Sequence, residues 1–288
     1  MAPKVWLITG TSSGFGLELA RCAARRGDRV IAASRSPQKL AHLETEGIKP
    51  IRLDHNEPLP QIQAAMNDAL AIYGTIDVVV NNAAYVHTGV LEEVTTEEAL
   101  QQYQANLFGP LNLYRALLPH LREKGSGTLI TIGSMAAWFA MPGCNLYNSS
   151  KAALRIMTLG LAEEVAQFGI KHCLVEPGFF RTGLLDPTAN FVATKDTKRL
   201  PAYANINATT DSGLAAYNGA QLGNPVRGAE IIYDVATSSG CAAGREFPGF
   251  LPLGSDACDV IQKSASQTLA DVDKWRDISS QSDFPKGQ

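Results

Sequence analysis

Tyr147 and Lys151 are the two residues whose types and spacing most directly suggest proton chemistry. They lie four positions apart in a stretch, 146–168, that is predicted to be helical, so their side chains project from one face. A phenol titrates near pH 10 in isolation and is then a poor acid–base catalyst at neutral pH. A neighbouring ammonium group favours the phenolate and lowers the pKa of the phenol. The pair could therefore give a proton to a carbonyl oxygen or take one from an alcohol.

Two more polar residues could complete such a site. Ser134 follows the predicted strand 127–133, at the sheet edge where its hydroxyl could orient a substrate oxygen. Asn106 lies inside the predicted helix 96–123, where asparagine competes with the helical backbone for hydrogen bonds. Taken singly, each residue also fits a structural interpretation: a core aromatic, a solvated lysine, a cap at a strand end, a buried amide. Only the four together favour catalysis.

A glycine-rich segment follows the first predicted strand, 5–9, and opens the predicted helix 14–26. It runs Thr9-Gly10-Thr11-Ser12-Ser13-Gly14-Phe15-Gly16. Glycine lets the backbone turn sharply and approach a pyrophosphate, which the free N–H groups and positive dipole end of the helix then bind. Such turns are also common without a ligand. The position directly after the first strand is what favours a dinucleotide here.

The elements that must position these residues alternate over the first two-thirds of the chain. The predicted strands are 5–9, 29–34, 48–53, 76–81, 127–133 and 170–175. The predicted helices are 14–26, 38–46, 59–73, 96–123 and 146–168. The strands are almost entirely apolar, as expected when helices cover both faces of a sheet. Parallel strands with right-handed crossovers predict an α/β, doubly wound, Rossmann-type three-layer sandwich, and 288 residues can form it as a single domain, 1–288.

The alternation ends after Pro177. Residues 183–223 mix Gly, Ala, Asn, Thr and Pro, and we expect a long loop that acts as a lid over the substrate. Asn224 and Pro225 suit the N-cap and first turn of another helix. An edge strand could lie within 245–253. Residues 255–288 are predicted to form a last amphipathic helix and a tail.

Together these motifs resemble those of the classical short-chain dehydrogenase/reductase family. The loop has the family spacing T-G-x-x-x-G-x-G, and the other family motifs follow in order over about residues 4–182: Asn81-Asn82-Ala83, Asn106, Ser134, Tyr147 with Lys151, and Pro177-Gly178. Ala84 departs from the pattern, since the family usually has a glycine there, near the cofactor. The resemblance implies hydride transfer between a nicotinamide cofactor and a carbonyl or alcohol, with Tyr147 as acid–base group. It also implies that Asn106 holds a water linking Lys151 to solvent.

The choice between NADP and NAD depends on the end of the second predicted strand. A site that prefers NAD usually has Asp or Glu there to bind the ribose 2′-hydroxyl, and this chain has Ser34. Arg35 can give a 2′-phosphate charge-assisted hydrogen bonds, helped by the hydroxyls of Ser12 and Ser36. An ordinary solvated loop arginine is the alternative. We expect NADP (NADPH), with NAD less favoured.

The resemblance assigns the remaining cofactor contacts. Asp54 would meet the adenine, although it could equally be a turn aspartate, and Thr182 would bond the nicotinamide carboxamide beside the turn at Pro177-Gly178. The adenosine side of the groove would be lined by Asn81 and Ala83. The expected cofactor-binding residues are Gly10, Ser12, Ser13, Gly14, Phe15, Gly16, Ser34, Arg35, Asp54, Asn81, Ala83, Tyr147, Lys151, Pro177, Gly178 and Thr182.

Apolar side chains dominate the segments expected around the substrate. The predicted substrate residues are Trp138, Phe139, Phe179, Leu184 and Leu185, with Met141, Phe180, Phe191, Tyr203 and Tyr217 as further candidates. Such walls suit an apolar or aromatic substrate rather than a sugar phosphate, while core packing is the alternative for each residue. The runs 176–180 and 253–257 are similar to the 17β-hydroxysteroid and retinol dehydrogenase-like branch. That resemblance implies steroids, retinoids or secondary-metabolite ketones and alcohols.

Composition excludes several other classes of protein. A net charge of −3 with no long basic run argues against nucleic acid as a partner. The five cysteines are scattered without a C-x-x-C pair, so neither a disulfide framework nor a metal site is predicted. The apolar run 5–8 is too short for a signal peptide or a membrane span, and we expect a cytoplasmic protein. The resemblance implies a homodimer or homotetramer.

Two functions from other classes remain open. A non-catalytic NADP sensor would share the fold, but such proteins typically lose the tyrosine or the lysine, and Tyr147 and Lys151 are both present. A fold-sharing lyase, epimerase or cyclase could use a recruited site. The four polar residues together favour the oxidoreductase, and metal ions are not expected to take part.

Overall fold

Seven parallel strands form the central sheet of this computed structural model, which describes residues 2–186 and 190–284. The order is β3-β2-β1-β4-β6-β7-β9, and every neighbouring pair is parallel. The strands are β1 (Val5–Thr9), β2 (Arg29–Ser34), β3 (Lys49–Arg52), β4 (Val78–Asn81), β6 (Gly127–Ile132), β7 (Ile170–Pro177) and β9 (Phe250–Leu253). This confirms the doubly wound α/β fold, and β9 is the edge strand expected within 245–253. Residues 187–189 of the expected lid and 285–288 of the expected tail lie outside the described residues.

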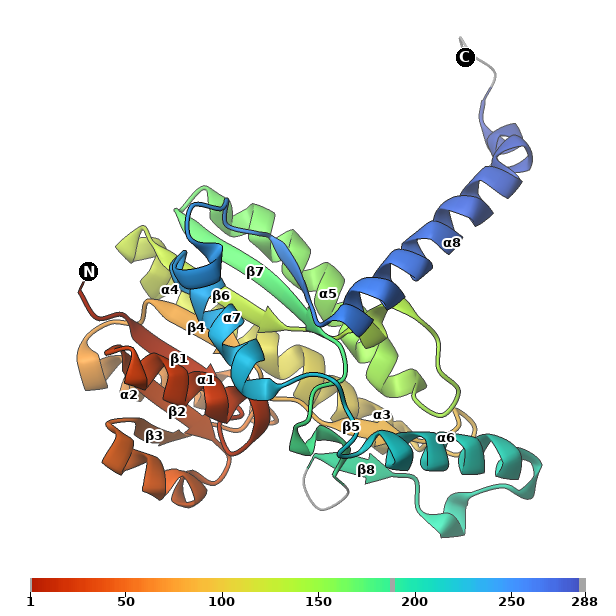
Figure 1. Cartoon of the computed structure of the whole chain (residues 1–288), viewed down its shortest axis with the longest axis horizontal. Helices are drawn as coiled ribbons and strands as arrows, with labels where there is room; N and C mark the ends of the chain where they lie inside the picture. Colours follow the sequence, from red (N-terminus) through yellow and green to blue (C-terminus); the bar gives the residue numbers. More distant parts are fainter. Residues whose placement is uncertain (1, 187–189, 285–288) are drawn as a thin grey trace.

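Helices cover both faces of the sheet, as Figure 1 shows, and an apolar cluster lies between each helix layer and the sheet. Alternate residues of β1 point to opposite faces: Trp6 and Ile8 pack into one core cluster, and Val5 and Leu7 into the other. One layer contains α1 (Gly14–Arg25) and α7 (Pro225–Thr237). The other contains α2 (Leu59–Tyr73), α4 (Gly109–Lys124) and α5 (Asn145–Ala166). The expected N-cap Asn224 accepts hydrogen bonds from the first turn of α7.

The predicted helix 96–123 is in fact interrupted. It consists of α3 (Thr96–Tyr103), a π-helical turn (Gln104–Phe108) and α4. Pro110 has no N–H and so cannot make the regular α-helical bond to the carbonyl of Asn106, four residues earlier. Within the turn, Gly109 N instead donates to Gln104 O, five residues back. Asn106 thus lies in a π-helical turn, a feature often found at functional sites.

The region 183–223 is more ordered than the expected loop. The strand β8 (Phe191–Ala193) pairs in parallel with β5 (Val86–Thr88), and the helix α6 (Ala204–Tyr217) follows. Figure 1 shows this small unit beside the carboxyl ends of the main strands. Its order depends on contacts with residues about a hundred positions earlier, which local composition does not reveal. The predicted helix 38–46 is a 3₁₀ helix, Pro37–Glu46.

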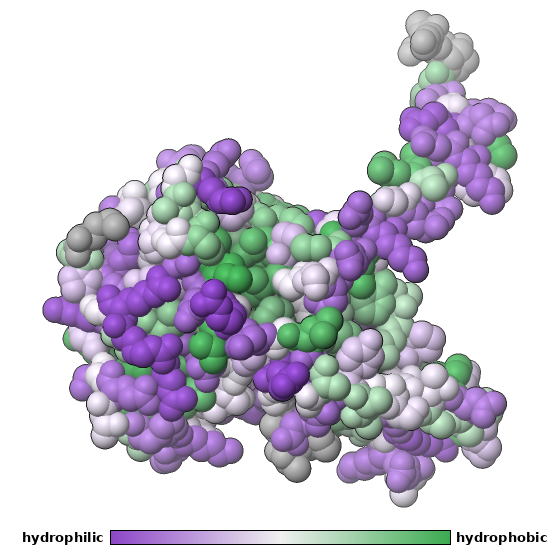
Figure 2. All heavy atoms as spheres, viewed as in Figure 1, coloured by the Kyte–Doolittle hydropathy of each residue, from purple (hydrophilic) through white to green (hydrophobic). Residues whose placement is uncertain are grey.

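The last helix, α8 (Ser255–Ser279), confirms the predicted C-terminal helix. Its first turns pack on the body through the buried Ala257 and Ile261. The rest projects away from the body, and its apolar stripe, which includes Leu269 and Trp275, is exposed (Figures 1 and 2). Over the described ranges, no helix combines the length and apolar character that a membrane crossing requires.

Candidate active site

A cleft with a volume of about 260 Å³ opens at the carboxyl edge of the sheet. This is the edge at which open α/β sheets bind their ligands. Residues from the ends of β1, β2, β4, β6 and β7 meet there, although they are far apart in the chain. The residues that were expected from the sequence and that line it are Gly10, Ser12, Ser13, Gly14, Phe15, Ser34, Arg35, Asp54, Ala83, Ser134, Phe139, Met141, Tyr147, Lys151, Pro177, Gly178, Phe179, Phe180, Thr182, Leu184 and Leu185.

The glycine-rich loop has a backbone that requires glycine. Gly10 and Gly14 have φ angles of 68° and 58°, in the left-handed region. A Cβ on Gly10 would lie 2.8 Å from the Cα of Ala83, and one on Gly16 would strike the carbonyl of Gly10. The N-cap of α1, Ser13, makes no side-chain capping bond. The first N–H groups of α1 are therefore left for another partner, and the loop fits a pyrophosphate.

Asn82 holds this loop against the end of β4. Its Nδ2 donates to the carbonyls of Thr9 (2.9 Å) and Gly10 (3.3 Å). Thr9 Oγ1 in turn accepts from the backbone N of Asn82 and Ala83, both at 3.0 Å. The cradle is thus built from the ends of two neighbouring strands.

Tyr147, Lys151 and Ser134 meet on one wall of the cleft. Tyr147 and Lys151 are both buried and lie one turn apart on α5. Lys151 Nζ donates to the carbonyl of Ile132 at 2.9 Å and lies 6.0 Å from the centroid of the Tyr147 ring. Ser134 begins a short 3₁₀ helix (Met135–Trp138), and its Oγ accepts from Ala136 N at 3.1 Å. The three polar groups therefore share one small volume.

Burial controls the protonation of this pair. It raises the pKa of Tyr147 to about 12, while hydrogen bonding with Ser134 opposes the shift. It lowers the pKa of Lys151 to about 8, while the carboxylate of Glu176 opposes the shift. The sequence predicted a lowered pKa for the phenol, whereas burial raises it in the structure. At neutral pH the phenol is protonated, as a proton donor must be, and the lysine is mostly charged.

Both polar atoms of the Asn106 side chain make structural hydrogen bonds. Its Oδ1 accepts from Tyr85 N (3.1 Å), and its Nδ2 donates to Tyr85 O (3.0 Å) and Ser150 Oγ (3.2 Å). The residue is entirely buried and does not line the cleft. Pro110 has no N–H to donate to the backbone carbonyl of Asn106, so this carbonyl lacks its regular α-helical partner.

Besides Asn106, three expected site residues, Asn81, Gly16 and Trp138, lie outside the cleft lining, as do the further candidates Ser36, Phe191, Tyr203 and Tyr217. Asn81 is buried and its Nδ2 donates to Pro110 O at 3.0 Å, while Asn82, Ala83 and Ala84 reach the cleft instead. Gly16 lies behind the loop, where it allows the close approach of α1 to β1. Trp138 ends the 3₁₀ helix and points to the opposite side, where its Nε1 donates to Glu176.

Several cleft residues were not anticipated from the sequence. His55, Tyr85, Cys144, Asn148, Asn190 and Leu214 all line it. Burial lowers the pKa of His55 to about 4, and neither ring nitrogen has a hydrogen-bond partner among the described residues. His55 could have been predicted as a cleft residue, because it follows Asp54 just after β3. No sequence pattern could have predicted Leu214, since it lies on a helix in a region whose composition indicates a loop.

The wall opposite the cofactor loop is apolar. Val86, Ala136 and Tyr147 form a cluster with the partly buried Phe139, Leu184 and Phe191. Phe179 stacks on Tyr217 with ring centroids 4.6 Å apart. Tyr203, another lid candidate, instead bonds Glu92 at the surface. Among the described residues, no cluster of His, Cys, Asp or Glu is arranged to hold a metal ion.

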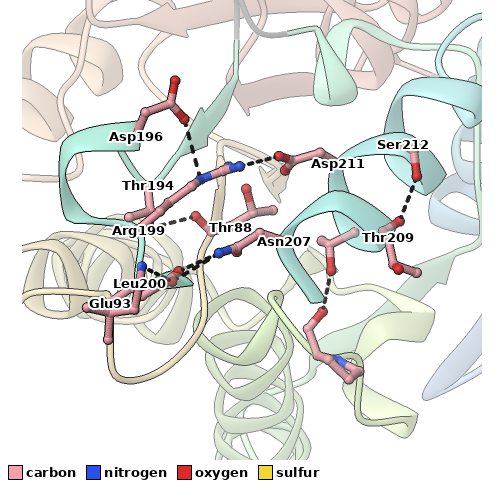
Figure 3. A network of polar contacts seen from close by, with 12 residues as sticks. Thr88, Glu93, Thr194, Asp196, Arg199, Leu200, Asn207, Thr209, Asp211 and Ser212 are labelled. Carbon is pink, nitrogen blue, oxygen red and sulfur yellow. Dashed lines mark hydrogen bonds and ion pairs between the residues drawn. The ribbon is translucent and has the colours of Figure 1, made fainter. Parts of the chain in front are cut away.

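A polar network ties the lid to the loop after β5 (Figure 3). Glu93 is buried and accepts from Asn207 Nδ2 with both oxygens and from Leu200 N at 2.8 Å. Arg199 pairs with Asp211 of α6 at 2.5 Å. Thr194 donates to Thr88 O through both its backbone N and its hydroxyl. These bonds position α6 and hence Leu214 at the cleft.

Comparisons with known proteins agree with this geometry. Residues 4–192 match the model of the family described as short chain dehydrogenase. An oxidoreductase of Botryotinia fuckeliana, BOA17, is 33% identical over 280 residues, covering 96% of this chain and 98% of its own. A 3-ketodihydrosphingosine reductase of Bacteroides thetaiotaomicron is 36% identical over 65% of this chain and 67% of its own.

Solved structures show the same relationship. A short-chain dehydrogenase from Streptomyces avermitilis superposes with a TM-score of 0.85 at 36% identity, over 97% of this chain and 100% of its own. ElxO with NADP shares the fold at 24% identity, with a TM-score of 0.69 over 89% of this chain and 99% of its own. A Burkholderia phymatum relative with NAD shares it at 21% identity, with a TM-score of 0.73 over 99% of this chain and 98% of its own. The chain belongs to the short-chain dehydrogenase/reductase family of oxidoreductases, which use NAD or NADP.

Proposed function

We propose that this protein is an NADP-dependent oxidoreductase that interconverts a ketone or aldehyde and an alcohol on a small, largely apolar substrate. The observation that carries the proposal is the meeting of Ser134, Tyr147 and Lys151 on a cleft with a glycine cradle on one side and an apolar wall on the other. A sensor or a lyase would not need a protonated phenol beside an ammonium at this place.

Each residue has a defined task in carbonyl reduction. When bound, the reduced nicotinamide supplies the hydride that the carbonyl carbon accepts. Tyr147 gives its proton to the carbonyl oxygen, so that one C–H and one O–H bond form as the C=O double bond is lost. Ser134 Oγ orients the same oxygen. The ammonium of Lys151 offsets the negative charge left on the phenolate until Tyr147 regains a proton from water.

The preference for NADP rests on Ser34 and Arg35. Both line the cleft, and Ser34 Oγ already accepts from the backbone N of Ser36 at 3.2 Å, which fixes the turn. The Arg35 side chain is exposed and carries the positive charge that a 2′-phosphate requires. A carboxylate in place of Ser34 would favour the 2′-hydroxyl of NAD instead. The other contacts proposed from the sequence, with Asp54 at the adenine and Thr182 at the carboxamide, complete this site.

The substrate class follows from the wall of the cleft. Phe139, Phe179, Leu184 and Leu185 offer apolar surface, and the cationic side chains of the lining, Arg35 and Lys151, lie on the cofactor side. A steroid-like, retinoid-like or secondary-metabolite carbonyl fits such a wall. We therefore place the chain in the 17β-hydroxysteroid and retinol dehydrogenase-like branch. The name of the Bacteroides relative, 3-ketodihydrosphingosine reductase, also supports a ketone as the reacting group.

The proposal also includes the cellular location and the oligomeric state of the protein. We place the protein in the cytoplasm, as a homodimer or homotetramer that pairs through α5. Ile156 and Met157 on this helix are 66% and 48% exposed, which leaves apolar surface for such pairing.

The test is to follow NADPH and NADH consumption with a panel of steroid, retinoid, quinone and polyketide-type carbonyls. Tyr147→Phe removes the proton donor and should lower kcat/KM by at least about a hundredfold, while NADPH binding is largely retained. Tyr73→Phe, far from the cleft, is the matched control and should behave as wild type. An unimpaired Tyr147→Phe enzyme, or NADPH binding with no carbonyl reduced, would overturn the proposal in favour of a lyase or a sensor.

A further inference from the structure

Glu176, on β7, is a buried carboxylate directly behind the proposed catalytic residues. Its side chain has no exposed surface. One oxygen, Oε2, accepts from Trp138 Nε1 at 2.5 Å and from Arg155 Nη1 at 3.2 Å. The other, Oε1, is buried and has no hydrogen-bond partner among the described residues. A carboxylate is costly to bury, so this arrangement calls for a role.

The carboxylate lies against the strand end that carries the site. A Cβ on Gly133 would lie 3.0 Å from Glu176 Cγ and 3.3 Å from its Oε1. Gly133 stands between Ile132, whose carbonyl accepts from Lys151, and Ser134. A side chain at this position would push the carboxylate back by a few tenths of an ångström, so the glycine favours the close approach that links β7 to both proposed catalytic segments.

Arg155 extends the row of functional residues along α5, which lies beside β7 in Figure 1. Tyr147, Lys151 and Arg155 are spaced by four, so they share one helix face. The Arg155 guanidinium lies 4.1 Å from the Trp138 ring and 5.1 Å from the Phe250 ring. Arg155 is therefore held between two aromatic rings and Glu176.

We propose that Glu176 is a positioning residue: its carboxylate anchors the far end of the segment that begins at Ser134, and its charge balances Arg155 so that Lys151 keeps its proton. The anchoring acts through Trp138, the last residue of the 3₁₀ helix that Ser134 begins. The charge of the Glu176 carboxylate acts on Arg155 and Lys151, which lie on the same face of α5. This role rests on the proposed function, since it concerns the same site.

The electrostatics of the surrounding groups support this role. The charged groups acting on Glu176 are Arg155 and Lys151, and both favour its ionised form, as does the Trp138 hydrogen bond, although burial raises its pKa. Lys151 faces Glu176 and the neutral Tyr147, and a weaker interaction links it to His55. Without the carboxylate, Arg155 would repel a second cation one turn away, and Lys151 would lose its proton at a lower pH.

The test is the pH dependence of NADPH binding, measured by fluorescence titration of the full-length protein. In the wild type we expect affinity to fall as the pH rises through about 8, where Lys151 loses its charge. In Glu176→Gln this fall should begin about one pH unit lower, which makes binding roughly fivefold weaker at pH 8 and leaves it unchanged at pH 6. Glu164→Gln, an exposed carboxylate change on the same helix, should have no effect.

The charges of the pair allow a decisive second comparison. Arg155→Gln should move the loss of NADPH affinity to higher pH. The double variant Arg155→Gln/Glu176→Gln should return the pH of this loss towards that of the wild type. A merely structural role would weaken binding equally at every pH, with no restoration in the double variant, and would overturn the proposal. Trp138→Phe removes only the indole donor. It should lower kcat for a reducible carbonyl and leave unchanged the pH at which NADPH affinity decreases.

The titration needs no substrate, so it separates the two hypotheses. If the wild type reduces no carbonyl but the binding curves shift as described, the proposed function fails and the role of Glu176 stands. If carbonyls are reduced but the curves of wild type and Glu176→Gln coincide, Glu176 is a packing residue only. A thermal melt of each variant checks that it is folded.

Discussion

The side-chain amide of Asn207, on α6, donates to both carboxylate oxygens of Glu93 at 3.0 Å. Glu93 is 4% exposed and also accepts from Leu200 N, so one buried carboxylate joins three segments (Figure 3). Since α6 carries Leu214 to the cleft, this contact helps to position the proposed substrate wall from outside the cleft lining. The hydrogen bonds of Glu93 therefore hold the lid, residues 183–223, against the loop after β5.

Replacing Glu93 should loosen the lid. In Glu93→Ala, Asn207 and the N–H of Leu200 lose their partner, which costs about 1–3 kcal/mol of stability in the lid. We expect KM for the carbonyl substrate to rise several-fold while NADPH affinity stays constant, because the cofactor loop is elsewhere. Glu97→Gln, at an exposed carboxylate in the first turn of α3, is the control. A change in NADPH affinity equal to that in KM would contradict the assignment.

Arg35 should decide the choice of cofactor. Charge-assisted hydrogen bonds contribute about 1.5–3 kcal/mol, so Arg35→Ala should weaken NADPH binding by roughly tenfold to a hundredfold and leave NADH binding nearly unchanged. Lys39→Ala removes another exposed positive charge from the same segment and should weaken NADPH binding only slightly. Isothermal titration with both nucleotides measures the difference, and equal losses for NADPH and NADH would exclude a contact with the 2′-phosphate.

The two directions of reaction should respond oppositely to pH. Reduction needs a protonated Tyr147, with a pKa of about 12, and a charged Lys151, with a pKa of about 8. We expect kcat/KM for reduction to be level near neutral pH and to decrease as the pH rises through about 8. Oxidation needs the phenolate and should increase towards alkaline pH. Initial rates from pH 6 to pH 10 in both directions test this, and a reduction rate that rises over that range would argue against Tyr147 as acid.

Buried histidines should make the fold sensitive to acid. Burial lowers the pKa of His172 from 6.5 to about 4. Because the unfolded chain binds the proton more readily, stability present above about pH 6.5 is lost as the pH falls towards 4, by roughly 3 kcal/mol for this residue. His172→Gln should flatten the decline in unfolding free energy measured by urea titration, whereas the exposed His42→Gln should not. An unchanged slope in His172→Gln would show that other groups cause the acid sensitivity.

Local patterns predicted much of the fold because they depend on near neighbours. The predicted helix 59–73 coincides with α2, and the predicted strands 5–9 and 29–34 coincide with β1 and β2. Each is long or apolar enough for its own periodicity to define it. The spacing of Tyr147 and Lys151 likewise placed them on one helix face, where the structure has them.

Predictions from local patterns failed where contacts between distant residues determine the structure. The region 183–223 gains β8 only by pairing with β5, whose Val86 lies opposite Phe191. Trp138 and Phe139 are adjacent, yet one bonds Glu176 and the other lines the cleft, because the 3₁₀ helix ends between them. No local pattern distinguishes the two aromatics.

The sequence by itself determined the family, the doubly wound sheet, the glycine-rich turn proposed to bind phosphate and the positions of the proposed acid and its lysine, since each is encoded in local residue patterns. Only the tertiary structure decided the protonation of Tyr147 and Lys151, the structural use of the Asn106 amide and the place of Glu176 behind the site. The physical reason is that burial and long-range hydrogen bonds set these properties, and both arise only when strands distant in the chain are brought together.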